Sequence, residues 1–550
     1  MLSRSSLLTA GAVILVGTPA VAQRERLTLS EVPLAVLGTL RPESFDAHWR
    51  FLADDLMEGR APGTRGGDLA AHYIAAQFEA LGLRPAWPSG YLQWVPLVAS
   101  RSETSLVIGA GRRTIVFDED TDFVAWPLRQ EEAIVFDADL VFGGYGIDAD
   151  EWGWDDFQGR SVAGKILLVR SGEPPRASRS ALQGGATRYG RWSYKVEQAQ
   201  RAGAVGILLI HSAEAGVGPW SAVQATWGRE VPQPERAGSH GMRFAAWITA
   251  DVARRIVEAT GMDYDLLMRR ADVPGFRAIE QGARAAVDIR SRFRSFRTPN
   301  VVGVLPGSED TGAASSVYLV AHYDHFGIGP SHEGDSIYNG AVDNASGVAA
   351  LLTLARGLAA APNSATHTLV FAATTAGEYD MAGAAALAAM PPTPLDHVAC
   401  VIALHEMNAW GMTRDIIGVG ADLSTIGPVA REAARLEELA LADPATAHGD
   451  LYDSDQFVFA RLGVPVVVLR RGQRAFDDGR LASADPVALF RAVHRHRPTD
   501  EIAESMSPDG VLQQVRVLAR VAWHFANAPT LPNWLPTSEF GGLRRGAPAR

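Results

Sequence analysis

The 550-residue sequence contains a single cysteine, Cys400, inside the apolar run VACVIAL. One cysteine cannot form an intrachain disulfide, so the fold depends on its hydrophobic core and not on covalent staples. We interpret Cys400 as a buried apolar residue, which is common for free cysteines, and not as a nucleophile. An excess of basic residues is also missing. The formal net charge is -11, which argues against nucleic acid as a partner.

The sequence also lacks an apolar run at its N-terminus that is long enough to span a membrane. The stretch Leu7–Val16 is too short for a comfortable span. It follows Arg4 and precedes Ala20-Val21-Ala22, a small-x-small cleavage site, so residues 1–22 are predicted to be a secretory signal. An uncleaved anchor is the alternative, and the absence of a following cysteine excludes a lipoprotein anchor. We expect a periplasmic or secreted protein with no integral membrane span after cleavage; the periplasmic location assumes a Gram-negative source.

The composition is otherwise that of a globular protein, with 47% hydrophobic and 21% charged residues. It supports more than one core, and the length suggests three or four domain-sized units. After residue 316, apolar runs typical of buried strands alternate with helical patterns. The predicted strands are 317–321, 367–373, 398–404 and 464–469, and the predicted helices are 346–360, 381–389, 424–437 and 508–526. This alternation predicts an α/β sandwich around a mostly parallel sheet.

The segments before this region differ from it. In residues 41–85, apolar residues recur at helical spacing, and Gly82 fits a helix C-cap. From residue 134 to about 275, two short buried strands, GKILLV and GILLI, flank a helix over 196–202. We expect the aromatic residues here to pack a small β domain; the alternative is that they form part of a substrate rim. They are Trp152, Trp154, Trp192, Tyr194, Trp220 and Trp227.

The chemistry concentrates in residues 317–347. The buried strand delivers His322 and Asp324 to its C-terminal end, and Asp343 lies just before the helix that begins near Ser346. In an open α/β sheet, ligands bind beyond the carboxyl ends of the strands. An imidazole and two carboxylates at that edge predict a metal site, with zinc the first choice for mixed nitrogen and oxygen ligands.

The segments AHYDHFG and GAVDNASGVAALLTLAR closely resemble the metal core of the M28 family of zinc aminopeptidases. The resemblance implies that His322 binds one zinc, that Asp324 orients His322, and that Asp343 bridges two zincs. It also implies a three-layer α/β sandwich of the zinc-peptidase type. LADDLMEGR near the N-terminus resembles a structural segment of the same family.

The next family strand ends in two glutamates, of which the first is the general base and the second binds zinc. THTLVFAATTAGEYD places Gly377 at the base and Glu378 at the ligand. Glycine has no side chain to accept a proton, and general acid–base assistance is typically worth about 100- to 10,000-fold. The resemblance therefore implies a retained zinc ligand and a missing base, unless Glu378, Glu406 or Asp380 substitutes for it.

In VACVIALHEMNAWG, the resemblance places His405 where the family has an aspartate ligand. Imidazole still binds zinc, but the change raises the charge of the site by one. Glu406 follows directly. If the strand end is bulged, Glu406 becomes a ligand or a stand-in base; if the strand continues, Glu406 points to the opposite face.

Two later segments complete the resemblance. In HGDLYDSDQ, Tyr452 matches a tyrosine that helps hold the substrate carbonyl or its oxyanion, and Gln456 replaces a histidine that is not a primary ligand. In VHRHRPTD, His496 matches the last zinc ligand, and Asp500 is its expected neighbour. The alternative for Tyr452 is a loop aromatic without a role in catalysis.

The insert resembles a protease-associated (PA) domain. The expected organisation is a signal peptide at 1–22, an N-terminal part of the peptidase domain at 23–133, the PA-like insert at 134–275, the metal-binding domain at 276–528 and a loose tail at 529–550.

The function implied is an exported exopeptidase that releases N-terminal residues from peptides by metal-activated water, with one or two zinc ions. Gly377 keeps open a non-catalytic relative that binds peptide or metal. His405 keeps open a single-zinc amidohydrolase or cyclase. The expected partner is a peptide substrate, and the sequence leaves the oligomeric state open.

Overall fold

The computed structural model describes residues 27–175, 187–213, 218–235, 241–308, 315–362, 364–442, 448–476 and 485–543. The predicted signal peptide lies outside these residues. Among the residues described, no helix is long and apolar enough to cross a membrane.

One sheet extends through the molecule, and its first half carries the predicted metal-binding strands. In spatial order these strands are β19 (Ala440–Ala442), β18 (Asp415–Val419), β20 (Val466–Arg471), β17 (Val398–Ala403), β13 (Ser316–His322) and β16 (Thr368–Thr374). β20, β17, β13 and β16 are mutually parallel, as the alternation of strands and helices predicts.

Helices cover both faces of this half, which makes it a three-layer sandwich. Along β13, Val317, Leu319 and Ala321 enter the core on one face, while Tyr318 and Val320 enter the core on the other. This alternation is the period-two pattern of a strand that is buried on both sides. The first face packs against α2 (Pro42–Leu52), α3 (Arg65–Ala80), α8 (Ser346–Ala359), α10 (Ile426–Leu436) and α13 (Asp509–Phe525), and the second against α9 (Ala382–Ala389) and α11 (Gln456–Arg461). The predicted fold class is confirmed.

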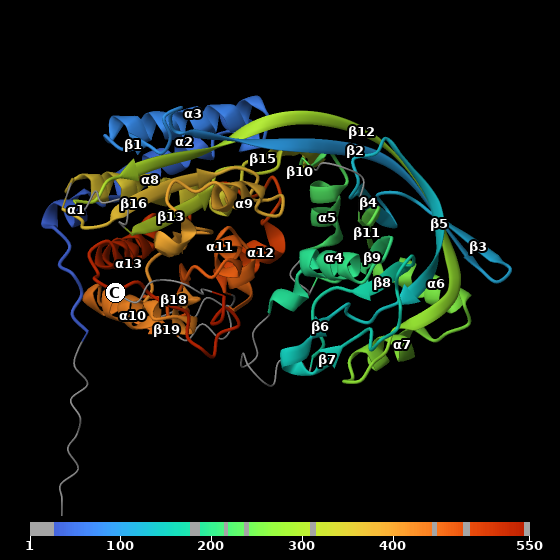
Figure 1. Ribbon diagram of the computed structural model, residues 1–550. Coiled ribbons are helices and arrows are strands. Elements are labelled where there is room, and N and C mark those ends of the chain that lie inside the picture. The colour runs from blue at the N-terminus through green and yellow to red at the C-terminus, as the bar shows by residue number, and fades with distance from the viewer. Residues whose placement is uncertain are drawn as a thin grey trace, which may run out of the picture.

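A long two-stranded ribbon joins this sandwich to the insert. β2 (Leu92–Ala110) pairs antiparallel with β12 (Ile279–Leu305) over 19 residue pairs. β12 continues the sheet at both ends, since it pairs with β16 near residue 303 and with β5 (Ala133–Phe142) near residue 287. Figure 1 shows the ribbon arching over the top of the molecule. Continuous backbone hydrogen bonding therefore fixes the insert relative to the sandwich.

The insert forms the second half of the sheet. Its strands are β5, β8 (Ile166–Arg170), β9 (Gly206–Ile210), β11 (Phe244–Ile248) and β4 (Phe123–Pro127). The two predicted strands and the predicted helix are β8, β9 and α4 (Trp192–Arg201). β10 (Val231–Pro234) leaves this domain to pair with β2. β4 precedes residue 134 but pairs with β11, so the insert's sheet includes a strand from the preceding segment.

The C-terminal segment is more ordered than the loose tail that the sequence predicts. Trp534 and Phe540 are buried, pack against each other at a tilted angle and join the core on the α9–α11 face. The proline- and glycine-rich composition predicts little ordered structure, but it does not decide the outcome here. Burying the two aromatic side chains removes a large apolar surface from water, which stabilises the ordered segment. α12 (Pro486–Val493) lies before α13 and leads into the segment that carries His496.

Candidate metal centre

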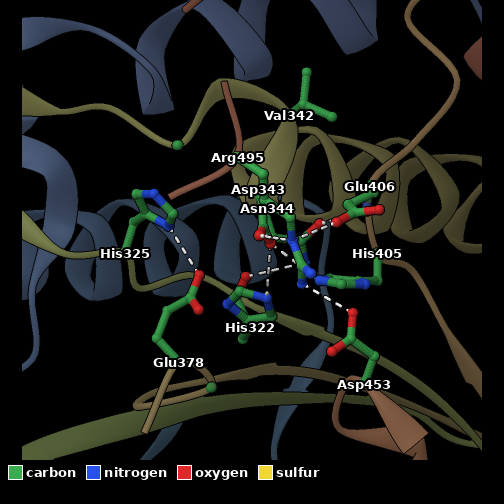
Figure 2. A network of polar contacts seen from close by, with 12 residues as sticks. His322, His325, Val342, Asp343, Asn344, Glu378, His405, Glu406, Asp453 and Arg495 are labelled. Carbon is green, nitrogen blue, oxygen red and sulfur yellow. Dashed lines mark hydrogen bonds and ion pairs between the residues drawn. The ribbon is translucent and has the colours of Figure 1, made fainter. Parts of the chain in front are cut away.

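Five polar side chains meet at one edge of the sheet, beyond the carboxyl ends of the parallel strands. β13 ends at His322, and the loops that follow β16 and β17 carry Glu378 and His405. Asp343 lies just before α8, and His496 follows α12. Figure 2 shows His322 and His405 converging on Asp343, with Glu378 to one side. The site lies where ligands bind in open α/β sheets.

The ligand atoms form two triads that share Asp343. His322, Asp343 and His405 form one group, and Asp343, Glu378 and His496 form the other; in each, the ligand atoms lie within 4.8 Å of one another. Asp343 Oδ1 lies 3.5 Å from His322 Nε2 and 3.0 Å from His405 Nε2. Asp343 Oδ2 lies 3.3 Å from His496 Nε2, which is 3.4 Å from Glu378 Oε2. All five residues predicted as metal ligands are therefore brought together.

The triad that contains Glu378 has a donor set that suits zinc, namely two carboxylates and an imidazole. His496 Nε2 is buried, and no hydrogen-bond partner for it is found among the described residues. A buried nitrogen without a partner costs free energy. A metal ion held by Asp343, Glu378 and His496 removes that cost, so these residues fit the metal that the sequence implies.

Asp500 fixes the backbone at Asp343. The Asp500 carboxylate accepts hydrogen bonds from the N–H groups of Val342, at 2.8 Å, and Asp343, at 3.0 Å. Burial raises the pKa of Asp500 to about 7. The expected pairing of Asp500 with His496 is replaced by this backbone contact, because the loop before α8 presents two N–H groups that need an acceptor.

Asp324 contacts His322, as expected, and also shapes the loop of Glu378. His322 Nδ1 lies 3.2 Å from the Asp324 carbonyl oxygen and 3.7 Å from its carboxylate. The carboxylate accepts a hydrogen bond from the N–H of Gly377 at 2.8 Å. Burial lowers the pKa of His322, but the Asp324 and Asp343 carboxylates outweigh it and hold the pKa well above its usual value. Asp324 therefore acts on the site through its neighbours.

His325 is a site residue that the sequence analysis missed. Its Nδ1 lies 2.8 Å from Glu378 Oε1, and its ring is buried beside Phe326 and His496. Burial lowers the pKa of His325, which favours the neutral ring with Nδ1–H donating to the Glu378 carboxylate. A hydrogen bond of this kind fixes the orientation of a metal-binding carboxylate. The signal was available, since His325 lies in the same AHYDHFG segment as His322.

Arginines surround the other triad, and they determine the state of Glu406. They are Arg470, Arg491 and Arg495. Glu406 Oε2 accepts hydrogen bonds from Arg491 at 2.6 and 3.0 Å, and its Oε1 lies 2.8 Å from Arg495 Nε. Burial raises the pKa of Glu406, but the guanidinium groups outweigh it and hold the pKa well below its usual range.

These contacts argue against the predicted role of Glu406 as a ligand or stand-in base. β17 ends at Ala403, and Glu406 has a φ of 45°, so the strand neither continues nor bulges at this residue. The carboxylate lies among the arginines because three cations are available there. A carboxylate held by two guanidinium groups is a weak proton acceptor.

Packing around Gly377 also leaves no space for a side chain at the position of the family's general base. A Cβ atom built on Gly377 would lie 2.4 Å from His322 Cγ. Such an approach is closer than any ordinary contact, so His322 has to move before a side chain fits. Glycine at 377 thus matches the packing of His322, and a glutamate cannot simply be restored there.

The Tyr452 hydroxyl is bound by the C-terminal segment. It donates a hydrogen bond to Glu539 Oε1 at 2.5 Å, and the Tyr452 ring packs edge-on against Phe457. The C-terminal segment supplies Glu539, and this contact engages the hydroxyl that the oxyanion role needs. The oxyanion role of Tyr452 stays a prediction. Gln456, which replaces a family histidine, donates to the Asp450 carbonyl at 2.7 Å.

A cavity of about 150 Å³ opens between the insert and the metal centre. Trp126, Trp192 and Trp227 from the insert line one side, and Glu378 and Tyr379 from the metal-site loop line the other. Trp192 and Trp227 also pack against Trp126 in the core of the insert. Of the six aromatic residues that the sequence singled out, these two therefore both pack the domain and face the site.

The family comparisons agree with this architecture. Residues 300–522 match the model of peptidase family M28, and residues 135–241 match the model of the PA domain. No curated protein matches the chain.

Solved structures are similar over nearly the whole chain. An aminopeptidase from Aneurinibacillus sp. strain AM-1 is 18% identical with a TM-score of 0.50, over 90% of this chain and 96% of that one. BSAP, a zinc aminopeptidase from Bacillus subtilis, is 17% identical with a TM-score of 0.46, over 94% and 100%. A peptidase M28 precursor from Shewanella amazonensis SB2B is 18% identical with a TM-score of 0.47, over 92% and 98%. At 18% identity, the first similarity shows a shared fold.

Proposed function

We propose that this chain, which carries a peptidase family M28 domain with an inserted PA domain, is a zinc-dependent exopeptidase that releases N-terminal residues from peptides. One observation carries the proposal. Asp343, Glu378 and His496 converge at the carboxyl edge of the sheet, and His496 Nε2 is buried beside two carboxylates without a hydrogen-bond partner among the described residues. We also propose export through the predicted signal at residues 1–22.

The metal in such a site acidifies a bound water and polarises a carbonyl group. The protein's own contribution is to hold the three ligands rigidly. Asp500 fixes the backbone of Asp343, and His325 fixes the carboxylate of Glu378. Supporting contacts of this kind set ligand direction and basicity.

The cavity beside Glu378 supports a substrate whose N-terminal side chain is apolar. Its insert wall includes three tryptophans together with Leu128, Val196 and Val231, and the cavity adjoins a proposed metal ligand directly. Apolar cavities with a few polar groups at one end are typical of small-molecule and side-chain binding sites. We infer that the insert contributes to substrate selection.

A second candidate is a non-catalytic relative that binds peptide or metal. Gly377 favours it, because the position of the family base has no side chain and no room for one. Two residues that could replace the base are paired with arginines. Asp380 lies 3.4 Å from Arg191, and Glu406 is held by arginines.

The test is release of N-terminal residues from a mixed pool of unblocked peptides by the full chain, with and without added zinc. We expect zinc-dependent release that is lost in Glu378→Gln, because the amide is a poorer metal ligand than the carboxylate. N-terminally acetylated peptides serve as the control and should not be cleaved. A zinc-loaded protein that binds peptides but releases nothing would replace the exopeptidase with the non-catalytic candidate.

A further inference from the structure

The two triads around Asp343 differ in what their histidines can still bind. A histidine that ligates a metal through Nε2 keeps a lone pair on that atom and carries its proton on Nδ1. The Nδ1–H group then normally donates to a carboxylate or a carbonyl oxygen. The partner of Nδ1 therefore indicates whether Nε2 is free to ligate.

His322 has the arrangement of a ligand, and His405 does not. His322 Nδ1 faces the carbonyl oxygen of Asp324 at 3.2 Å, which accepts an N–H group. His405 Nδ1 faces the guanidinium of Arg470, with Nη2 at 2.9 Å. A guanidinium has only donors, so it occupies the Nδ1 lone pair of His405.

A neutral His405 ring consequently carries its proton on Nε2. That atom lies 3.0 Å from Asp343 Oδ1, the distance of a hydrogen bond to a carboxylate. Arg470 is buried, and its other groups donate to the His405 carbonyl and to Asp450, so several contacts hold it in this position. Two contacts of His405, one on each nitrogen, thus specify the same tautomer.

Arg495 adds a positive charge directly against the shared carboxylate. Its Nε lies 3.0 Å from Asp343 Oδ2 and 2.8 Å from Glu406 Oε1, and its Nη2 lies 2.9 Å from Asp453 Oδ2. Figure 2 shows Arg495 beside Asp343 and Glu406. Asp343 Oδ2 also faces His496, so Arg495 acts on the carboxylate that both triads share and does not distinguish them. The contact of Arg470 with His405 does distinguish them, because it leaves a second divalent ion only two available donors, His322 and Asp343 Oδ1.

The Glu378 side has the opposite character. Its carboxylate oxygens face His325 at 2.8 Å and His496 at 3.4 Å, and among the residues described no arginine or lysine pairs with it. His496 Nε2 has no hydrogen-bond partner in the same part of the chain. This half of the cluster keeps three donor groups together, since the ligand atoms of Asp343, Glu378 and His496 lie within 4.8 Å of one another.

We propose that the chain binds one zinc ion, at Asp343, Glu378 and His496, and that Arg470 makes His405 unavailable to a second ion at His322, Asp343 and His405. The proposal deepens the proposed function and rests on its metal site. It departs from the two-metal arrangement that the sequence resemblance implies. His405 thereby becomes a positioning residue, which hydrogen-bonds Asp343 and does not ligate the metal.

The experiment is equilibrium dialysis of the metal-depleted full chain against buffered zinc, with bound zinc counted by mass spectrometry. We expect about one tightly bound zinc per chain. His496→Gln should weaken it by more than about 100-fold, since even an outer-shell partner is typically worth 10- to 100-fold. His405→Gln is the matched control. It should keep the single zinc within about 10-fold, the low end of outer-shell effects.

Two zinc ions per wild-type chain, or an equal loss in both variants, would overturn the proposal. Circular dichroism and thermal unfolding check that each variant folds. If a variant does not fold, the number of zinc ions bound per wild-type chain still tests the proposal. The experiment does not read out hydrolysis. One zinc without peptide release would therefore remove the proposed function alone, and release by a two-zinc enzyme would remove this inference alone.

Discussion

The two oxygens of Asp343 face surroundings that look alike in the sequence and differ in the structure. On each side, a histidine nitrogen lies close to the carboxylate: His405 Nε2 at 3.0 Å from Oδ1, and His496 Nε2 at 3.3 Å from Oδ2. Arg470 occupies the other ring nitrogen of His405, whereas His496 Nε2 has no hydrogen-bond partner among the described residues. Arg495 contacts Oδ2 itself, so the difference lies in the histidines and not in the carboxylate. A ligand motif thus gives the positions of donor atoms. The hydrogen bonds made by the other ring nitrogen of each histidine decide whether the donor atom is available to a metal.

The largest effect should come from the residue that both sides share. Asp343→Asn replaces the shared carboxylate by an amide and removes its charge, so zinc affinity should fall by more than about 100-fold and peptide release with it. Asp453→Asn is the matched control, because Asp453 also pairs with Arg495 and ligates nothing. Zinc titration and residue release measure both variants. If both variants lose the same amount of zinc affinity, that affinity depends on the negative charge that pairs with Arg495 and not on ligation by Asp343.

Glu406→Gln tests the arginine side by its stability. The substitution leaves Arg491 and Arg495 with less charge compensation in a buried setting, and breaking a buried ion pair typically costs about 3–5 kcal/mol. We expect a lower free energy of unfolding in urea, with the single zinc retained. A variant of normal stability and full zinc content that has lost all peptide release would instead make Glu406 the missing base.

His325→Gln tests how far the metal depends on the support of Glu378. Loss of the imidazole hydrogen bond to Oε1 should weaken zinc about 10- to 100-fold and lower peptide release in proportion at limiting zinc. Excess zinc should restore the rate, because the ligands themselves remain. His494→Gln is the control, since that ring stacks on Phe490 and touches no proposed ligand. A rate that stays low at saturating zinc would show that His325 acts on the reaction itself.

The sequence was sufficient for the parts that depend on local pattern. Alternating strands and helices predicted the sandwich, and strand ends predicted where His322 and Glu378 lie, because the carboxyl ends of parallel strands share one edge. Side-chain direction was the harder part. Tyr452 and Asp500 occupy the expected places in the chain, but their polar atoms bond to Glu539 and to the backbone before α8.

The arginine group escaped prediction for a different reason. Arg470 lies on β20, 65 residues after His405, and Arg495 lies 152 residues after Asp343. No periodicity or spacing links such pairs, and only the assembled sheet brings them together. Arg495 stands directly before His496 in VHRHRPTD, so a cation next to a ligand was visible, but its target was not.

The smallest expected effect concerns the insert residues that line the cavity beside the metal centre. Trp192→Ala enlarges the cavity beside Glu378 and removes apolar contact, so KM for peptides with a large apolar first residue should rise about 10-fold, or roughly 1–2 kcal/mol. The KM for peptides that begin with alanine should change little, because a small side chain does not reach the wall. Trp152→Ala is the control, since Trp152 packs on Tyr189 and does not line the cavity. If both variants raise KM equally for all peptides, the tryptophans maintain the fold of the insert and select no substrate, and the two halves of the sheet work independently.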